Sequence, residues 1–406
     1  MLDVVQEILA FNAGRDPDRL RLKYRNMRAS PFVFLRGTCH LFYRRLPADA
    51  LFDEAPPVWS CGDLHVQNFG SYKGDNGLVY FDLNDFDEAL LAPATLDLVR
   101  FLCSVLVAAP DMGVGRKEAR ALGRAFLDNY RATLAAGRAR WVERDTADGL
   151  IRSLLAGLHG RLRPAFLDGR TERKGKHRRL RLDKGKALPV IASQREQVTA
   201  LIGGLASRHD DPDFFEVLDV ARRIAGNGSL GVDRYVILVR GHGSPDGNEL
   251  LDLKEALPSS VLPRVATPQP DWRSEADRVV SIQQRMQAVP MAFLQPLRWR
   301  KRSYMLRALQ PSEDRVSLDA GQAGASALEG VLAHMGAIVA SAQLRSGGRD
   351  GSAIADALIA FGQGAWRTAL LGAARACAGQ VEKDWAAYCT AYDDGAFAEA
   401  GGAQSG

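Results

Sequence analysis

Two motifs that follow each other closely, CGDLHVQN at 61–68 and YFDLNDFD at 80–87, constrain the structure of this chain more than any other feature. A short apolar run at 58–60 leads into the first motif, and a second run at 78–83 leads into the other. Both runs have the length and composition of buried strands, and the stretch 73–77 supplies a turn between them. The sequence therefore predicts a hairpin that gathers several polar side chains.

The polar side chains of this hairpin are those that transfer of a phosphate-containing group requires. Asp63 is placed to accept a hydrogen bond from an attacking hydroxyl and to help take its proton, while Asn68 and Asp85 are candidates for holding Mg²⁺. Asp82 and Asp87 compete with Asp85 for the metal. The D-F dipeptide favours Asp85 and leaves Asp82 as a second metal candidate or a supporting carboxylate. The competing explanation is an ordinary polar turn, since Gly-Asp and Asn-Phe-Gly are common turn sequences.

Two other residues, His65 and Arg36, have more than one interpretation, whereas Cys39 and Cys103 have one. His65 belongs to the candidate catalytic group, where a hydrogen bond that orders the loop is favoured over contact with the metal. Arg36 either reaches the site or forms an ordinary ion pair. Cys39 and Cys103 lie in apolar predicted helices and are expected in the core.

A Gly-rich segment, GNGSLG at 226–231, forms a second group of candidate residues. A dinucleotide-binding turn of this type is followed by a helix, whereas here a predicted strand at 234–240 follows, so that interpretation fails. A Gly-rich loop that covers phosphates, with a lysine on a following strand, fits the order better. The candidate phosphate-binding residues are Gly226, Gly228, Ser229, Gly231 and Lys254.

The lysine of this group has a simpler explanation and a candidate partner. Lys254 is followed by Glu255, so a surface ion pair is the alternative to phosphate binding. If Lys254 binds phosphate, a helical carboxylate should position it, and the predicted helix 274–288 offers Glu275 for that role. Gln283 and Gln284 lie nearer the middle of the same helix, and the sequence does not decide between the three.

The order of the two groups predicts an unusual arrangement. In protein kinases the Gly-rich loop and lysine precede the catalytic hairpin, whereas here they follow it. A circular permutation explains this reversal. The expected organisation is a large, mostly helical lobe formed by 1–218 and 312–406, and a small lobe of antiparallel strands formed by 219–311 that covers the nucleotide. The fold class is therefore α+β.

The motifs resemble those of the aminoglycoside-phosphotransferase branch of the protein-kinase-like superfamily, where H-G-D-x-H-x-x-N is followed by an I-D-F or I-D-W strand. The chain also looks like a member of a large uncharacterised bacterial family, a domain of unknown function. The resemblance covers nearly the whole chain. It is carried by SPFVFLRG (30–37), CGDLHVQNFG (61–70), FDLNDFDEAL (81–90), GNGSLGVDRYVILVRG (226–241) and LDLKEA (251–256).

This resemblance implies a two-lobed kinase-like fold, binding of ATP and Mg²⁺, and transfer of a phosphoryl group to a hydroxyl of a small molecule or a protein. Two positions depart from the pattern. Cys61 stands where the phosphotransferase branch usually has His, which affects packing beneath the loop. Gln343 stands where His is expected, which puts a supporting contact in doubt.

Three other functions remain open from the sequence. A nucleotidyl transferase uses the same parts with the nucleotide turned round, and a non-catalytic nucleotide-binding scaffold would keep the same shape. A metallophosphoesterase is the weakest alternative. Its two-metal site needs further histidines, usually including one after Asn, and none of the seven histidines follows an Asn.

Composition limits the partners and the compartment. The formal net charge of +5 is mild and does not by itself indicate nucleic-acid binding. The segment 161–186 holds eleven Lys and Arg residues against three acidic ones, and a solvated loop or a β-ribbon is expected there. Five cysteines without a C-x-x-C pair favour a reducing cytoplasm. The most apolar stretch, 96–109, is too short to span a bilayer, so no membrane association is expected.

Overall fold

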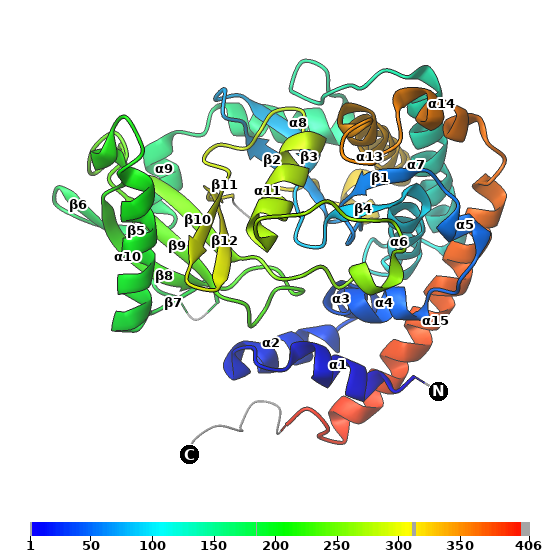
Figure 1. Ribbon diagram of the computed structural model, residues 1–406, viewed down its shortest axis with the longest axis horizontal. Coiled ribbons are helices and arrows are strands. Elements are labelled where there is room, and N and C mark those ends of the chain that lie inside the picture. Colours follow the sequence, from blue (N-terminus) through cyan, green and yellow to red (C-terminus); the bar gives the residue numbers. More distant parts are fainter. Residues whose placement is uncertain (1, 184, 311–313, 399–406) are drawn as a thin grey trace.

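The computed structural model describes residues 2–183, 185–310 and 314–398, and it combines helices with small antiparallel sheets. Figure 1 shows the strands of the largest sheet gathered at one end of the molecule and most of the long helices at the other, with α11 between them. The expected mixture of helices and antiparallel strands is confirmed.

The first helices begin where the sequence places capping residues. Asp3, Asp16 and Ser30 each accept a hydrogen bond from a backbone N–H in the first turn of α1, α2 and α3. Pro17 and Pro31 occupy first helical positions, where no backbone donor is lost. The described segment before residue 30 is mostly helical. These elements are α1 (Val4–Asn12), α2 (Pro17–Met27), α3 (Pro31–Gly37), α4 (Cys39–Arg45) and α5 (Ala50–Asp53).

The motif hairpin has a different strand pairing from the one predicted. Its two strands are β2 and β3, paired from Phe69 with Leu83 to Lys73 with Val79. The run before the first motif is β1, which pairs with β4 after the second motif and so closes the base of the loop. The strands are β1 (Pro57–Ser60), β2 (Phe69–Lys73), β3 (Val79–Leu83) and β4 (Leu90–Pro93).

The helical part is built around two helices from distant parts of the sequence. Helices α7 and α13 approach so closely that a Cβ at Gly336 would lie 2.0 Å from the carbonyl oxygen of Phe126, so only glycine fits there. Helix α15 packs against α6. The helices are α6 (Ala94–Val107), α7 (Arg116–Ala136), α8 (Gly149–His159), α12 (Ala320–Ala323), α13 (Ala325–Ser346), α14 (Ala355–Gln363) and α15 (Arg367–Asp393).

Helix α13 is the one helix in the described part of the chain whose length and composition would allow it to cross a membrane. Its side chains Leu332, Val339 and Ala342 are buried in the core that it shares with α7. This burial is that of a core helix, and it is compatible with a soluble protein.

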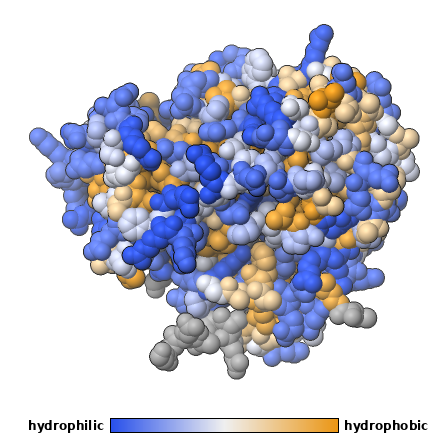
Figure 2. All heavy atoms as spheres, in the orientation of Figure 1, coloured by the Kyte–Doolittle hydropathy of each residue, from blue (hydrophilic) through white to orange (hydrophobic). Residues whose placement is uncertain are grey.

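In Figure 2 the visible face is mostly hydrophilic, with hydrophobic residues scattered in small groups.

The six-stranded sheet is antiparallel with the order β11-β12-β10-β9-β8-β7. It reaches beyond the predicted segment 219–311, because β8 begins at Val217 and β7 pairs with it at the sheet edge. The strands and their helices are β7 (Ala187–Leu188), α10 (Ala192–Ala206), β8 (Val217–Arg223), β9 (Arg234–Val239), β10 (Glu249–Glu255), α11 (Glu275–Met286), β11 (Gln295–Trp299) and β12 (Arg302–Ala308), with short 3₁₀ turns at Pro212–Phe215 and Leu262–Arg264.

The two faces of this sheet have different neighbours. Ile237, Leu253 and Leu306 pack with α10 on one face, which we call the outer face. The opposite, inner face carries Val236 and Leu250, which pack with Leu167 and Leu180 of the basic segment. That segment forms α9 (Arg163–Asp168) and a ribbon of β5 (Thr171–Lys174) and β6 (His177–Leu180), so the ribbon alternative is confirmed.

Candidate active site

The two groups of candidate residues meet in one cavity although they lie far apart in the sequence. Asp63 and Asp85, the Gly-rich loop 226–231 and Lys254 all line a cavity of about 460 Å³. The ammonium of Lys254 contacts the carboxylate of Asp87, which lies 167 positions earlier. The structure thus brings the hairpin and the lysine strand to one place.

The loop that carries Asp63 is held by buried partners. Gly62 has φ 73°, and a Cβ there would lie 2.2 Å from the carbonyl oxygen of Glu88, so the turn requires glycine. The carboxylate of Asp97 accepts hydrogen bonds from the backbone N–H groups of Cys61 at 2.8 Å and Gly62 at 2.9 Å. The hydroxyl of Tyr43 donates to the carbonyl of Gly62 at 2.7 Å. The backbone before Asp63 is therefore fixed from several sides.

Asp63 is paired on one oxygen and open on the other. The fully buried Arg100 donates from Nε to Oδ1 at 2.7 Å and contacts the same oxygen through Nη2. No hydrogen bond from a described residue reaches Oδ2, and 23% of the side chain is exposed in the cavity. Burial raises the pKa of Asp63, and the Arg100 guanidinium opposes that rise. The free oxygen is thus a basic group that a ligand hydroxyl can reach.

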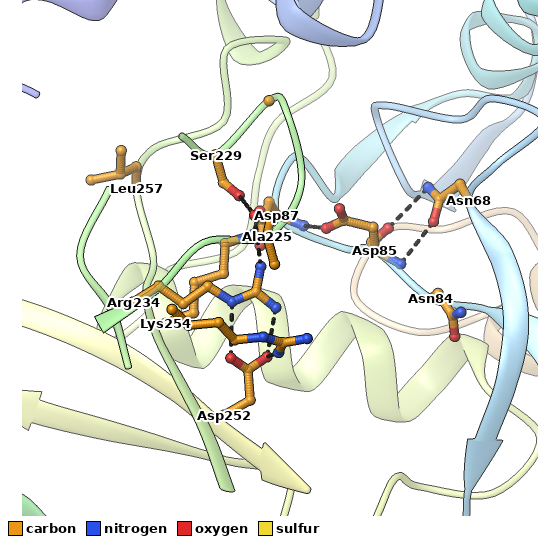
Figure 3. A network of polar contacts seen from close by, with 12 residues as sticks. Asn68, Asn84, Asp85, Asp87, Ala225, Ser229, Arg234, Asp252, Lys254 and Leu257 are labelled. Carbon is orange, nitrogen blue, oxygen red and sulfur yellow. Dashed lines mark hydrogen bonds and ion pairs between the residues drawn. The ribbon is translucent and has the colours of Figure 1, made fainter. Parts of the chain in front are cut away.

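Asn68 joins the two motifs through its side-chain amide. Its Oδ1 accepts from the N–H of Asp85 at 2.7 Å, and its Nδ2 donates to the carbonyl of Asp85 at 3.2 Å (Figure 3). The same Nδ2 donates to the carbonyl of Asp63 at 3.3 Å. An amide oxygen has two lone pairs, so Oδ1 retains one for a metal ion. Asn68 therefore fixes the distance between the two carboxylate-bearing loops.

Asp85 lines the cleft beside several cations. Burial in the cleft raises its pKa, but Lys254, Arg307 and Arg234 outweigh that effect, and the pKa falls below its usual value. Asp85 is therefore ionised at neutral pH. Among the described residues, its Oδ1 receives only a long bond of 3.4 Å from the N–H of Asp87, so the carboxylate remains available for a ligand.

Asp82, the second metal candidate, has a different position. Its buried carboxylate accepts from the N–H groups of Leu83 at 2.8 Å and Ala288 at 3.1 Å and pairs with Arg345 at 3.2 Å. Asp82 does not line the 460 Å³ cavity. It links β3 to α13 and to Ala288, two residues after the end of α11, which corresponds to the supporting role weighed from the sequence.

The available donors fit a magnesium ion bound together with phosphate. The carboxylate of Asp85 and the amide oxygen of Asn68 are hard oxygen ligands on adjacent loops, and Asp87 lies two residues from Asp85. Magnesium keeps several water or phosphate ligands and needs only one or two protein carboxylates. These residues would hold it, with phosphate oxygens completing the shell.

The Gly-rich loop is bent by glycines with left-handed backbones. Gly226 has φ 72° and Gly231 has φ 90°, which other residues rarely adopt. A Cβ at Gly228 would lie 3.1 Å from the carbonyl oxygen of Arg36. The hydroxyl of Ser229 donates to the carbonyl of Ala225 at 3.3 Å, within the loop.

The N-terminal helices hold this loop in place, which the sequence did not reveal. Arg15 and the fully buried Lys23 both donate to the carbonyl of Gly228, at 3.1 and 3.3 Å. Arg19 donates to the carbonyl of Val232 at 2.9 Å. Burial lowers the pKa of Lys23 well below its usual value, and the charge of Arg15 lowers it further. The N-terminal segment is therefore a wall of the cavity.

Glu275 lies outside the cavity, and His65 lines the cavity but has a partner within its own loop. Glu275 pairs with Arg278 at 2.7 Å and does not line the cavity. Arg278 instead donates to the carbonyls of Asp87 at 3.0 Å and Ala89, so it anchors the hairpin to α11. His65 lines the cavity, but its Nδ1 accepts from the N–H of Gln67 at 3.1 Å, and burial lowers its pKa well below the usual value. His65 is therefore neutral and orders the loop through this hydrogen bond.

Further residues of the site could be recognised only in part from the sequence. Asp97 and Arg100 are charged residues within the otherwise apolar run 96–109, and that contrast was the available signal. Arg36 lines the cavity and donates to Gln67 at 2.7 Å. Gln343, at the position of the expected His, accepts from the hydroxyl of Tyr130 at 2.6 Å, so its contact is part of the α7–α13 core.

A family profile described as an uncharacterised protein conserved in bacteria (DUF2252) matches residues 15–391. The chain belongs to this family. No curated protein and no solved structure is similar enough to this chain to be matched. The matched range includes all the motif residues that line the cavity, from Asp63 to Lys254.

Proposed function

We propose that this protein binds ATP with Mg²⁺ and transfers a phosphate-containing group from it to a hydroxyl, as kinase-like enzymes do. The observation that carries the proposal is the convergence of Asp63, Asp85 and Lys254 with the Gly-rich loop in one cavity. Phosphoryl transfer depends almost entirely on positioning and charge, and these are the groups it needs.

The strand order supports a kinase-like fold for this proposal. The Gly-rich loop joins β8 to β9, Lys254 lies on β10, and α11 follows before β11 and β12. In protein kinases the Gly-rich loop likewise precedes a third strand that carries the lysine, and a helix follows it. The catalytic hairpin precedes this unit in the chain, which is the arrangement that a circular permutation produces.

The residues divide the chemical work between them. Asp63 would accept the hydrogen bond of an acceptor hydroxyl on its free Oδ2 and take the proton, while Arg100 holds Oδ1 and fixes the carboxylate. Lys254 would exchange part of its contact with Asp87 for a phosphate oxygen. Bound Mg²⁺, held by Asp85 and Asn68, would neutralise charge on the phosphate oxygens. The site can transfer either the γ-phosphoryl group or the nucleotidyl group, depending on the direction in which the nucleotide lies.

A thermal-shift and turnover panel with ATP, GTP, Mg²⁺ and Mn²⁺ tests the proposal. We expect Mg·ATP at one hundred times its Kd to stabilise the protein by about 2.7 kcal/mol. The Lys254→Met variant should lose most of this stabilisation, whereas Lys117→Met, which changes an exposed lysine on α7, should keep it. Binding without any turnover would indicate a scaffold, and absence of nucleotide binding would refute the proposal.

A further inference from the structure

The inner face of the six-stranded sheet carries an arginine cluster next to Lys254. Arg223, Arg234 and Arg307 surround the single carboxylate of Asp252, which is fully buried. Arg234 donates to both oxygens of Asp252 at 2.9 and 2.6 Å (Figure 3). Arg223 lies 2.8 Å from Oδ2 of Asp252, and Arg307 lies 3.4 Å from the same oxygen. Three buried or half-buried guanidinium groups therefore share one carboxylate, and the cluster carries an excess of positive charge.

The cluster occupies one of two sides on which a nucleotide base could lie. Asp252 is two residues from Lys254 on β10, so the two side chains point to the same face of the sheet. If phosphates bind at Lys254 and the Gly-rich loop, the base lies either toward Asp252 or toward the mouth of the cavity. A base needs apolar contacts for its flat faces. On the Asp252 side it would have to displace paired, buried charges, which is costly.

A separate cavity beside the cluster is also lined by cations. It has a volume of about 210 Å³, lies between the sheet and the basic segment, and shares none of its described lining residues with the main cavity. Arg223 lines it together with Arg170, Arg181 and Lys186, and the acidic residue there, Asp183, already accepts from the N–H of Gly185 at 2.8 Å. Guanidinium groups match the oxygens of phosphate in a forked geometry. Phosphate groups therefore fit this side better than a base does.

The mouth of the main cavity, which we define by the exposed lining residues Ala13, Leu257 and Pro258, offers apolar contacts instead. The side chains there are contributed by the N-terminal segment, the strand-entry residue after the Gly-rich loop, and the turn after β10. These lining residues are Phe11, Ala13, Val232, Leu257 and Pro258. The Phe11 ring stacks on His40, with ring centroids 3.8 Å apart, and the Arg15 guanidinium lies 4.8 Å from its centroid. The faces of a base would therefore be covered by the aliphatic side chains and by the guanidinium of Arg15, which also lines the cavity.

Resting on the proposed function, we infer that the nucleotide lies with its base at the mouth and its terminal phosphates toward Arg223, Arg234 and Arg307, so that the group transferred is the nucleotidyl group. In this orientation the α-phosphorus faces Asp63. The acceptor oxygen forms a bond to the α-phosphorus, and the bond from that phosphorus to the α,β-bridging oxygen breaks. The electron pair leaves with pyrophosphate, and the hydroxyl proton passes to Asp63. The products are a nucleotidylated acceptor and pyrophosphate.

Two measurements on the full-length protein test the orientation without a known acceptor. The first is product analysis with Mg·ATP, in which water is the acceptor: AMP and pyrophosphate are expected, and ADP with phosphate would overturn the inference while leaving the proposed function intact. The second, which needs no turnover, is photolabelling with 8-azido-ATP and Mg²⁺. Label on peptides containing 11–16 or 255–258 is expected, and label on 180–188 or 305–310 would overturn the inference.

Tripolyphosphate, which lacks a base, gives a third readout by calorimetry in the presence of Mg²⁺. Arg223→Met should weaken tripolyphosphate binding at least tenfold, because it removes one guanidinium from the proposed phosphate site. The variant should still fold, since Arg234 and Arg307 continue to pair with Asp252. The matched control is Arg195→Met, which removes a half-exposed arginine of α10 that pairs with Asp219. Equal affinity in Arg223→Met and Arg195→Met would contradict the inference. If the wild type binds neither 8-azido-ATP nor tripolyphosphate, the proposed function itself fails.

Discussion

Replacing Asp63 with Asn should stop transfer while leaving the nucleotide bound. The substitution keeps the shape of the side chain and the contact of Oδ1 with Arg100, but it removes the basic oxygen that faces the cavity. A positioned general base contributes about 10²- to 10⁴-fold to a rate. At about 1.36 kcal/mol for each tenfold change, the barrier should rise by about 2.7–5.4 kcal/mol.

The same substitution has a cost in stability that must be separated from the chemistry. Arg100 is fully buried and would face a neutral partner. A partly satisfied buried charge of this kind should cost about 1–3 kcal/mol, less than the ~3–5 kcal/mol for a buried pair that is broken outright. Rates should therefore be measured well below the melting temperature, with the folded fraction checked by circular dichroism.

The assay is initial-rate hydrolysis of Mg·ATP together with calorimetric nucleotide affinity. Asp75→Asn is the matched control, because Asp75 is an exposed aspartate in the turn of the same hairpin. We expect the Asp75 variant to match the wild type in both assays. If Asp63→Asn turns over ATP as fast as the wild type, Asp63 is not the general base. If the variant no longer binds the nucleotide, Asp63 contacts the nucleotide and not only the acceptor hydroxyl.

Three further predictions follow from the same site. Asp85→Ala should weaken Mg·ATP binding at least tenfold but change metal-free ATP binding much less; titrations with and without Mg²⁺ check this, and equal losses in both would contradict the metal role. Gly62→Ala should destabilise the protein by more than about 2 kcal/mol, because it adds a clash with Glu88 to the backbone strain, whereas Gly77→Ala, with φ 81° and open space around it, should cost only about 1 kcal/mol in chemical denaturation; equal losses would show that the loop can relax. The acid limb of the pH–rate profile should lie above the pKa of an ordinary aspartate, about 3.9, because burial raises the pKa of Asp63 and only its ionised form accepts a proton; a limb at or below that value would contradict the assignment.

Local sequence signals predicted the elements of the site well. The strand predicted at 234–240 is β9, Lys254 lies on the following strand β10 as expected, and the helix predicted at 274–288 is α11. The hairpin motifs predicted a gathering of Asp63, Asn68 and Asp85 because their turn residues and spacing are local. Such features depend on neighbouring residues, and the sequence shows those directly.

Partners from distant parts of the chain were harder to predict. Glu275 has helical spacing that suits a lysine partner, yet the structure pairs Lys254 with Asp87 and gives Arg278 the contact between α11 and the hairpin. The N-terminal segment has no motif that signals its contact with Gly228. These pairings depend on how separate elements pack, and many charged residues in the sequence would satisfy the same pattern.

The most direct test of the central claim is a crystal structure with Mn²⁺ and a non-hydrolysable ATP analogue. Mn²⁺ replaces Mg²⁺ at oxygen ligands and is located by its anomalous scattering. We predict a peak within coordination distance of the Asp85 carboxylate, with a phosphate between that metal and the ammonium of Lys254. A nucleotide bound elsewhere on the protein, with Asp85 and Lys254 still facing water, would contradict the claim.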